Sequence, residues 1–222
     1  MYIRTEVRLP AERTDLLYPR YIHDYVKKKD LAIALQKVKN FDKPDPSLEQ
    51  YMTNANLAAE MLFDAYANGD IAGMKIIDLG CGTGMLSIGS WLLGAGAVKG
   101  FDISEKALSV AETNRNAFGA DTEFVHCDVC DVDEEADTVV MNPPFGCQTR
   151  NADRAFLNKA MEISECIYSI HMANSVDFVK EYCSEKGRSV CSCKIYKYDI
   201  PHVFAFHKRA KQTVDVAVLN IR

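Results

Sequence analysis

The sequence lacks the long hydrophobic runs and the excess of positive charge that mark two large classes of protein. No uninterrupted apolar stretch approaches the ~20 residues that a membrane-spanning helix requires, so we expect no membrane span. The net charge is −5, from 26 Lys and Arg against 31 Asp and Glu residues. This balance argues against binding of long nucleic acid by bulk electrostatic attraction. Residues 1–8 also lack the apolar core of a signal peptide, and we expect a cytoplasmic protein.

Disulfides and metal sites are not expected either. There are 8 cysteines, and without a signal peptide free thiols are the better interpretation. Cys127-x-x-Cys130 and Cys191-x-Cys193 have the spacing of zinc ligands, but 60 residues separate the two pairs. The first pair also encloses Asp128, which has another expected role at the end of a strand. We therefore predict no metal.

The segments from residue 74 onward alternate between strand-like and helix-like patterns. This alternation predicts βαβ units and a mostly parallel sheet. After a helix near 174–186, Gly187 introduces two strand-like segments with no helix signal between them, which predicts an antiparallel pair. The expected strands lie near 75–79, 97–101, 122–127, 137–141, 166–170, 188–198 and 212–221.

No internal repeat or low-complexity linker divides the chain, and 222 residues can bury a substantial core. We expect one domain over 1–222, in which residues 1–50 form an N-terminal extension of the core over 51–222. Before residue 74 the expected elements are a short strand over 3–9, a helix near 22–40, and a helix that begins after Thr53 or Asn54 and ends at Asn68.

The most informative motif is Asn142-Pro143-Pro144-Phe145, which follows an expected strand. Each proline fixes its own φ and disfavours a helical conformation of the preceding residue, so the chain leaves the strand as a rigid, extended arm. Such an arm can present the Asn142 side-chain oxygen and the Pro143 carbonyl as two acceptors for a planar –NH2 group. Phe145 offers a face on which a flat ring can stack. The alternative is a Pro-rich turn that only ends a strand.

A Gly-rich turn lies about 60 residues earlier, between an apolar strand and a helix. It reads Asp78-Leu79-Gly80-Cys81-Gly82-Thr83-Gly84, and its glycines permit tight turning and close approach of a ligand. The G-x-G-x-G spacing differs from the G-x-G-x-x-G of dinucleotide-binding folds. The G-x-x-x-x-G-K-S/T of phosphate loops is also absent from the sequence, so ATP is disfavoured as a ligand.

Acidic residues end three successive expected strands. Asp78, Asp102 and Asp128 would meet at the carboxyl edge of a parallel sheet, where such folds bind ligands. Asp102 is placed to accept both hydroxyls of a ribose, and Asp128 to accept from an adenine amino group. Each aspartate could instead cap a helix, but Ser104 is a better N-cap for the helix that follows Asp102.

Together these motifs resemble the S-adenosylmethionine-dependent methyltransferases of the Rossmann-like class, and the Asn142 motif matches members that methylate exocyclic amino groups. One branch is similar over roughly residues 27 to 222. It is the methyltransferase-like protein five family with its archaeal relatives, which are ribosomal RNA adenine-N6 methyltransferases. Met52 stands where this branch usually has proline, and residues 1–26 have no counterpart. Further segments that carry the resemblance are Gln50-Tyr51-x-Thr53, Leu92-Leu93-Gly94-Ala95-Gly96, Cys127-Asp128-Val129-Cys130, Ala155-Phe156-Leu157 and Ile167-Tyr168-Ser169-Ile170-His171.

The resemblance implies a Rossmann-like class I methyltransferase α/β fold. Its mostly parallel seven-stranded sheet would have a C-terminal antiparallel strand pair and helices on both faces. It also implies S-adenosylmethionine as the cofactor, commonly a small zinc-binding activator subunit as partner, and methyl transfer by Asn142, Pro143, Pro144 and Phe145. The residues expected to bind the cofactor, with Gln50 and Thr53 over its methionine end, are Gln50, Thr53, Asp78, Gly80, Gly82, Thr83, Gly84, Met85, Asp102, Asp128 and Val129.

The expected activity is methylation of adenine N6 in RNA, most of all ribosomal RNA, with the base unpaired or flipped out. Aromatic and basic residues interleave over 204–211, a combination that suits stacking on bases and contacts to phosphates of single-stranded RNA. The residues expected to bind the substrate are Phe204, His207, Lys208 and Arg209.

Three alternatives stay open. Guanine-N2 methyltransferases of ribosomal RNA also carry Asn-Pro-Pro-Phe. Enzymes that methylate a glutamine amide in a protein usually have tyrosine where Phe145 stands. The chain could also be a cofactor-binding scaffold that assists an active partner, although intact Gly80, Asp102 and Asn142 argue against that interpretation.

Overall fold

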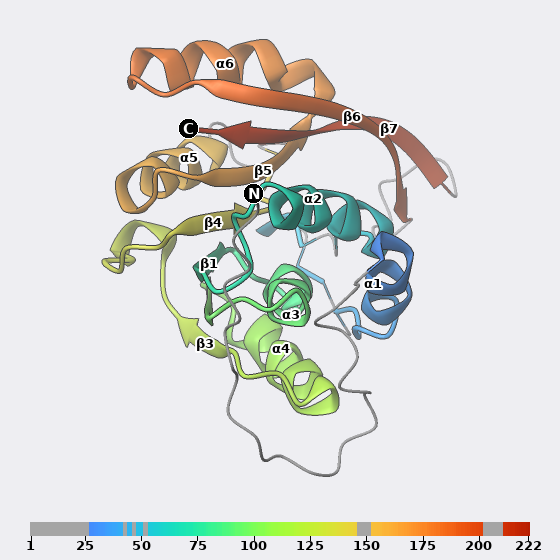
Figure 1. Ribbon diagram of the computed structural model, residues 1–222. Coiled ribbons are helices and arrows are strands. Elements are labelled where there is room, and N and C mark those ends of the chain that lie inside the picture. The colour runs from blue at the N-terminus through green and yellow to red at the C-terminus, as the bar shows by residue number, and fades with distance from the viewer. Residues whose placement is uncertain (1–26, 42–43, 46–47, 51–52, 146–151, 202–210) are drawn as a thin grey trace, which may run out of the picture.

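The structure is built around one sheet (Figure 1). The computed structural model describes residues 27–41, 44–45, 48–50, 53–145, 152–201 and 211–222. Within these residues the strands are β1 (Lys75–Leu79), β2 (Ala97–Asp102), β3 (Glu123–His126), β4 (Thr138–Met141), β5 (Ile167–Met172), β6 (Val190–Pro201) and β7 (Lys211–Ile221). They are hydrogen-bonded in the order β3-β2-β1-β4-β5-β7-β6.

The direction of the strands changes at β5. β1 pairs in parallel with β2 and β4, and β3 and β5 continue the parallel part on either side. β7 runs antiparallel to β5, and β6 runs antiparallel to β7. The predicted seven-stranded, mostly parallel sheet with a C-terminal antiparallel pair is confirmed. β4 is buried at all of its residues, because it lies between β1 and β5 with helices on both faces.

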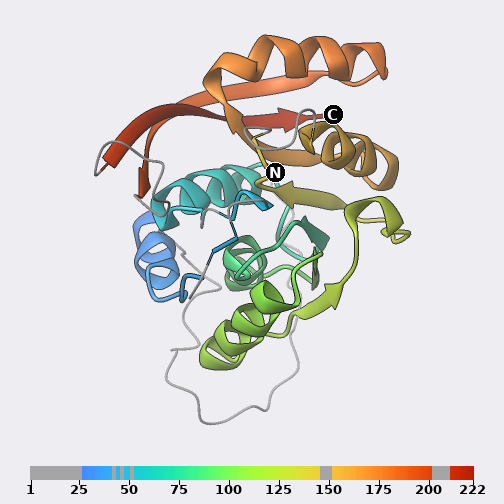
Figure 2. The ribbon, with the colours of Figure 1, turned by 180° about the vertical axis from the view of Figure 1, so that it is seen from behind.

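Helices cover both faces of the sheet (Figure 1 and Figure 2). In the described residues they are α1 (Lys28–Leu35), α2 (Ala55–Ala67), α3 (Met85–Leu92), α4 (Glu105–Phe118), α5 (Ala152–Ile163) and α6 (Val176–Glu185), with short 3-10 turns at Val129–Asp131 and Ala173–Ser175. Apolar residues of α1, α2 and α3 form the core on one face, and those of α5 and α6 form it on the other. None of these helices is long and apolar enough to cross a membrane.

Two helices begin at the residues that the sequence indicated. The Asn54 side chain accepts a hydrogen bond of 2.8 Å from the Asn56 N–H at the start of α2. The Ser104 hydroxyl oxygen accepts one of 3.3 Å from the Ala107 N–H at the start of α4. Ser104 therefore caps the helix, and the neighbouring Asp102 is not required for that purpose.

The first helix is shorter than the predicted span 22–40. α1 ends at Leu35, because the next turn tightens to bonds from Lys37 N to Ala34 O and from Val38 N to Leu35 O. Val38 is nevertheless buried in the core, as its spacing on an amphipathic helix indicated. Residues 22–26 and the strand predicted over 3–9 lie outside the described residues.

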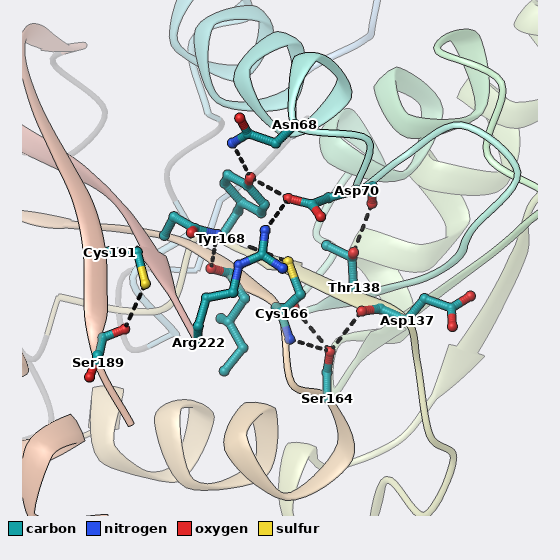
Figure 3. Close-up of polar contacts among 12 residues, drawn as sticks. Asn68, Asp70, Asp137, Thr138, Ser164, Cys166, Tyr168, Ser189, Cys191 and Arg222 are labelled. Atoms are coloured by element: carbon teal, nitrogen blue, oxygen red, sulfur yellow. Dashed lines mark hydrogen bonds and ion pairs between the residues drawn. The ribbon is translucent and has the colours of Figure 1, made fainter. Parts of the chain in front are cut away.

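A hydrogen-bond network closes the amino ends of the central parallel strands (Figure 3). One carboxylate oxygen of Asp70, which follows α2, accepts bonds of 2.6 Å from the Tyr168 hydroxyl and from the Arg222 guanidinium. Asn68 donates to the Tyr168 oxygen over 2.8 Å, and the Thr138 hydroxyl donates to the Asp70 carbonyl over 2.7 Å. The network joins α2 to β4, to β5 and to the residue after β7, and burial raises the pKa of Tyr168.

Candidate functional site

A cavity of about 260 Å³ lies at the carboxyl edge of the parallel strands. Its walls come from the segments that follow β1, β2, β3 and β4 and from the chain before α2. Among the predicted site residues, Gly84, Pro143 and Phe145 are not part of its lining. Those that line it are Gln50, Thr53, Asp78, Gly80, Gly82, Thr83, Met85, Asp102, Asp128, Val129, Asn142 and Pro144.

The Gly-rich turn after β1 has a backbone that residues with a side chain rarely adopt. The φ angle is +69° at Gly80 and +55° at Gly82. A Cβ atom on Gly80 would lie 2.9 Å from the Phe156 ring, and one on Gly82 would lie 3.1 Å from the Phe41 ring. The two glycines therefore permit both the turn and the close packing of two aromatic rings at the cavity.

Asp78 is buried beneath this turn, with one carboxylate oxygen used and the other unused. Oδ2 accepts bonds from the Ser87 backbone N–H (2.9 Å) and from the Ser87 hydroxyl (2.6 Å). Oδ1 is buried and has no hydrogen-bond partner within the described residues. Loss of water around the carboxyl raises the pKa of Asp78 to about 7. A ligand that brings a donor or a cation would meet an unused acceptor here.

Asp102 is held by backbone N–H groups at the end of β2. Its Oδ2 accepts from Gly82 N and its Oδ1 from Ser104 N, both over 2.8 Å. These bonds fix the carboxylate beside the Gly-rich turn, and each oxygen keeps a lone pair for a further donor. Burial raises the pKa of Asp102 above its ordinary value. The geometry is compatible with two ribose hydroxyls, a role that stays a prediction.

Asp128 acts as a cap at the end of β3, which was the alternative interpretation of this residue. Its Oδ1 accepts a bond of 2.9 Å from Cys130 N at the start of the 3-10 turn Val129–Asp131. Asp128 also lines the cavity together with Val129. The cap uses only one carboxylate oxygen of Asp128. The predicted contact of the other oxygen with an adenine stays a prediction.

Asn142 follows β4 and has one used and one unused end on its side-chain amide. Its Nδ2 donates to the Thr53 hydroxyl oxygen over 2.9 Å. Its Oδ1 is buried, and no residue in the described part of the chain donates to it. A buried acceptor without a donor typically costs about 1–3 kcal/mol. Because Asn142 lines the cavity, this oxygen is an acceptor that a bound ligand can satisfy.

The residues after Asn142 divide between the cavity and the core. Pro144 lines the cavity, whereas Pro143 is buried. Phe145 is half-buried and packs against the core on the α1, α2 and α3 face. Stacking of Phe145 on a base therefore stays a prediction, and Phe41 and Phe156 are the rings beside Gly82 and Gly80 that line the cavity.

The loop before α2 forms the rim of the cavity. The Gln50 side-chain oxygen accepts a bond of 2.8 Å from Asp45 N, so Gln50 closes its own loop while it lines the cavity. Glu49 has a φ of +49°, which is uncommon for a residue other than glycine and is typical of functional loops. The sequence carries no pattern that distinguishes this backbone conformation at Glu49.

Several lining residues have no role in the sequence-based prediction. They are largely apolar, and hydrophobic spacing cannot distinguish a cavity wall from the core. The segment Ala155-Phe156-Leu157 belongs to the resemblance, and this is the one signal that could have identified Phe156. These lining residues are Phe41, Leu48, Glu49, Cys81, Leu86, Phe101, Ile103, Cys127 and Phe156.

The predicted RNA-binding residues Phe204, His207, Lys208 and Arg209 lie outside the described residues. Where the structure does describe the chain, no group of three or more His, Cys, Asp and Glu side chains is arranged to hold a metal ion. Cys127 lines the cavity, and Cys130, Cys191 and Cys193 are exposed free thiols.

Comparisons with known proteins give similarities over most of the chain. The family model described as methyltransferase small domain matches residues 53–165. An uncharacterised protein of Methanocaldococcus jannaschii is 38% identical, over 88% of this chain and 94% of its own. The rRNA N(6)-adenosine-methyltransferase METTL5 of Danio rerio is 36% identical, over 89% of this chain and 98% of its own. A solved structure from Pyrococcus horikoshii, to which RNA methyltransferase activity is ascribed, is 41% identical with a TM-score of 0.84, over 89% of this chain and 98% of its own.

Proposed function

Because the chain belongs to the methyltransferase small domain family, we propose that it transfers a methyl group to the N6 atom of an adenine in RNA, with ribosomal RNA as the substrate. The protein is an S-adenosylmethionine-dependent N-methyltransferase. The resemblance to the methyltransferase-like protein five family is confirmed by the relative from Danio rerio. That relative is named for N6 methylation of adenosine in ribosomal RNA, and this name supports the same substrate here.

The residues around the cavity fit S-adenosylmethionine. Asp102 is fixed at the cavity with lone pairs that would accept from the two ribose hydroxyls. Asp128 and Val129 line the same cavity and would bind the adenine. The unused Asp78 Oδ1 would accept from the ammonium of the methionine group. Gln50, which lines the same cavity, would complete this end of the site. The cofactor, when bound, supplies an electrophilic methyl group.

The observation that carries the proposal is the buried, unused Asn142 Oδ1 at the wall of this cavity. The amino group of adenine is a poor nucleophile because its lone pair is delocalised into the ring. Asn142 Oδ1 accepts one of its N–H groups, and the carbonyl of Pro143, a residue next to the cavity lining, would accept the other. These two bonds orient the nitrogen and favour a pyramidal geometry with a freer lone pair. Positive charge that develops on the nitrogen is stabilised by the two fixed acceptors. Positioning of this kind needs no strong base.

The alternatives differ in product, and one experiment separates them. Purified protein is incubated with cofactor and either RNA or ribosomal and release-factor proteins. The nucleosides of the digested RNA and the peptides of the digested proteins are then analysed by mass spectrometry. We expect N6-methyladenosine. N2-methylguanosine would identify a guanine-N2 enzyme, a methylated glutamine in a ribosomal or release-factor protein would identify a protein methyltransferase, and no transfer to any substrate would favour the scaffold.

We extend the proposal to the RNA contacts. Phe204, His207, Lys208 and Arg209 combine rings for stacking with positive charge for phosphates, which suits a short unpaired segment. Charge reversal at Lys208 and Arg209 should lower RNA affinity and its salt dependence, because fewer counterions are released. Cofactor affinity, measured by calorimetry, should not change. An unchanged salt slope would remove this cluster from the RNA interface.

The family resemblance also supports a partner, a small zinc-binding activator subunit. β3 and β6 are the edge strands of the sheet, and within the described residues each pairs with a neighbouring strand on one side only. An edge strand offers free N–H and C=O groups to which a partner strand can be added. Turnover of the chain alone is compared with turnover after addition of such a subunit. Equal turnover and no complex on size-exclusion chromatography would contradict this part of the proposal.

A further inference from the structure

Thr53 and Asn142 are 89 residues apart in the sequence, yet they meet at the cavity wall in one hydrogen bond of 2.9 Å. Thr53 is 6% exposed and lies directly before Asn54, the residue that caps α2. Asn142 directly follows the buried strand β4. Both partners are therefore fixed by packed elements, and neither side chain belongs to a free-standing loop tip.

The direction of this bond decides what Asn142 offers to a ligand. A side-chain amide has two ends of nearly the same shape, of which the –NH2 end donates and the oxygen end accepts. Thr53 Oγ1 accepts from the –NH2 end, so Asn142 Oδ1 remains as the unused acceptor. With the amide turned over, Asn142 would present a donor to the amino group of the substrate, and two donors would face each other.

We infer that Thr53 is a positioning residue for the methyl transfer, which acts by accepting the Asn142 Nδ2–H. The inference rests on the proposed function, since it assigns Asn142 Oδ1 to the substrate amino group. The Thr53 hydroxyl can serve either end of an amide, and with Thr53 as acceptor the Asn142 Nδ2 group has a partner in the orientation that leaves Oδ1 for the substrate. Loss of the hydroxyl therefore penalises the orientation that the chemistry requires.

This role differs from the contact to the methionine end of the cofactor that the family resemblance implies for Thr53. A cofactor contact would alter cofactor affinity, whereas a positioning role alters the rate at saturating cofactor and leaves affinity unchanged. If Thr53 only contacted the cofactor, the effect of its substitution would also not depend on the residue at position 142. These differences make a double-mutant cycle between the two residues decisive.

The cycle uses Thr53→Val, which keeps the shape and removes the hydroxyl, and Asn142→Asp, whose two carboxylate oxygens are equivalent and need no orientation. Single-turnover methyl transfer is measured at saturating cofactor and RNA for the wild type, both single variants and the double variant. We expect Thr53→Val to lower the rate about tenfold or more, and Thr53→Ser to restore most of it. In the Asn142→Asp background, Thr53→Val should have almost no further effect.

A matched control is available at the other end of β4. Thr138→Val also removes a buried threonine hydroxyl, one that donates to the Asp70 carbonyl over 2.7 Å. It should lower the melting temperature without changing the rate. An equal fold loss from Thr53→Val in both backgrounds, or a loss of cofactor affinity that accounts for the rate, would overturn the inference.

Failure of the proposed function is recognised separately, from the product that the wild type makes. A second readout does not depend on any product: hydrogen exchange of the Asn142 side-chain N–H groups, followed by NMR in the wild type and in both Thr53 variants. Exchange should be slow with threonine or serine and faster with valine. Unchanged exchange in Thr53→Val would overturn the assignment of Thr53 as the acceptor, whatever the enzyme methylates.

Discussion

The amino ends and the carboxyl ends of the central strands β1, β4 and β5 differ in how their buried polar groups are paired. At the amino edge, Asp70, Tyr168 and Arg222 satisfy one another in a closed network. At the carboxyl edge, Asp78 Oδ1 and Asn142 Oδ1 are buried without a partner among the residues described. The same central strands contribute to both edges, so the difference arises from the residues at the strand ends and not from the fold.

This difference separates groups that stabilise the fold from groups kept for a ligand. A network in which each donor meets an acceptor contributes to folding and specifies how the elements are joined. A buried acceptor without a donor costs stability, and such exceptions call for an explanation by function. The cavity at the carboxyl edge provides that explanation for both oxygens, because both residues line it.

The largest effect is expected at the carboxyl edge, where the unused acceptors lie. Asn142→Ala should lower single-turnover methyl transfer by about 10²-fold or more, because it removes an acceptor that faces the developing charge. Cofactor affinity should change little, and the melting temperature should fall only modestly, since the lost oxygen has no partner in the described protein and the bond from Nδ2 to Thr53 is the one interaction removed. Near-normal turnover would show that the extended arm is only structural. It would also show that the unused oxygen of Asn142 does not serve the reaction.

Asp102→Ala tests the cofactor side of the same edge. We expect S-adenosylmethionine binding to weaken by about 2–4 kcal/mol, the value of two charge-assisted hydrogen bonds. Asp102→Asn is an intermediate variant, because its one amide oxygen can accept from either Gly82 N or Ser104 N, which bind different oxygens of Asp102 in the wild type. Calorimetric titration measures affinity, and thermal unfolding without cofactor separates it from stability. Equal affinities in wild type and Asp102→Ala would remove Asp102 from the site.

The raised pKa of Asp78 at the carboxyl edge should make the stability of the protein depend on pH. Because this pKa is about 7 in the folded protein against 3.8 for an ordinary aspartate, the folded state holds an extra proton between these values. Stability should therefore fall as pH rises from about 4 to 7, by roughly 3 kcal/mol. Asp78→Asn should flatten this slope in denaturant unfolding measured across that range. An unchanged slope in the variant would assign the pH dependence to another group.

The smallest effect is expected at the amino edge, where the closed network lies, and it concerns stability alone. Tyr168→Phe removes the hydroxyl that joins Asn68 to Asp70, and should cost about 1–2 kcal/mol of unfolding free energy. kcat/KM should not change, because Tyr168 lies at the edge opposite the cavity. A change in rate without a change in stability would show that the two edges are coupled.

The fold could be predicted from the sequence because its signals are local. Each of the seven described strands matches an expected apolar run, and Asn54 and Ser104 cap helices where their side chains indicated. The polar site residues at strand ends could also be predicted from the sequence, since a parallel sheet binds ligands at its carboxyl edge. Asp102 and Asn142 line the cavity in agreement with that rule.

The remaining features depend on side chains that meet from distant parts of the chain. The bond between Thr53 and Asn142, the contact of Phe156 with Gly80 and the network around Asp70 each join residues that no sequence pattern connects. The placement of Phe145 against the core is of the same kind, because an aromatic ring after a strand can face either direction.

The shortness and complete burial of β4 have a consequence for motion. Its four residues lie between two other strands, with Thr138 tied to Asp70 at one end and Asn142 tied to Thr53 at the other. Backbone amides in such a strand exchange with solvent only when the whole molecule unfolds. We therefore expect Asn142, the acceptor proposed for the substrate amino group, to follow one of the slowest-exchanging strands of the protein. A nucleotide that binds next to Asn142 therefore contacts a rigid strand end. Discrimination among bases then depends on shape and hydrogen-bond complementarity and not on rearrangement of β4.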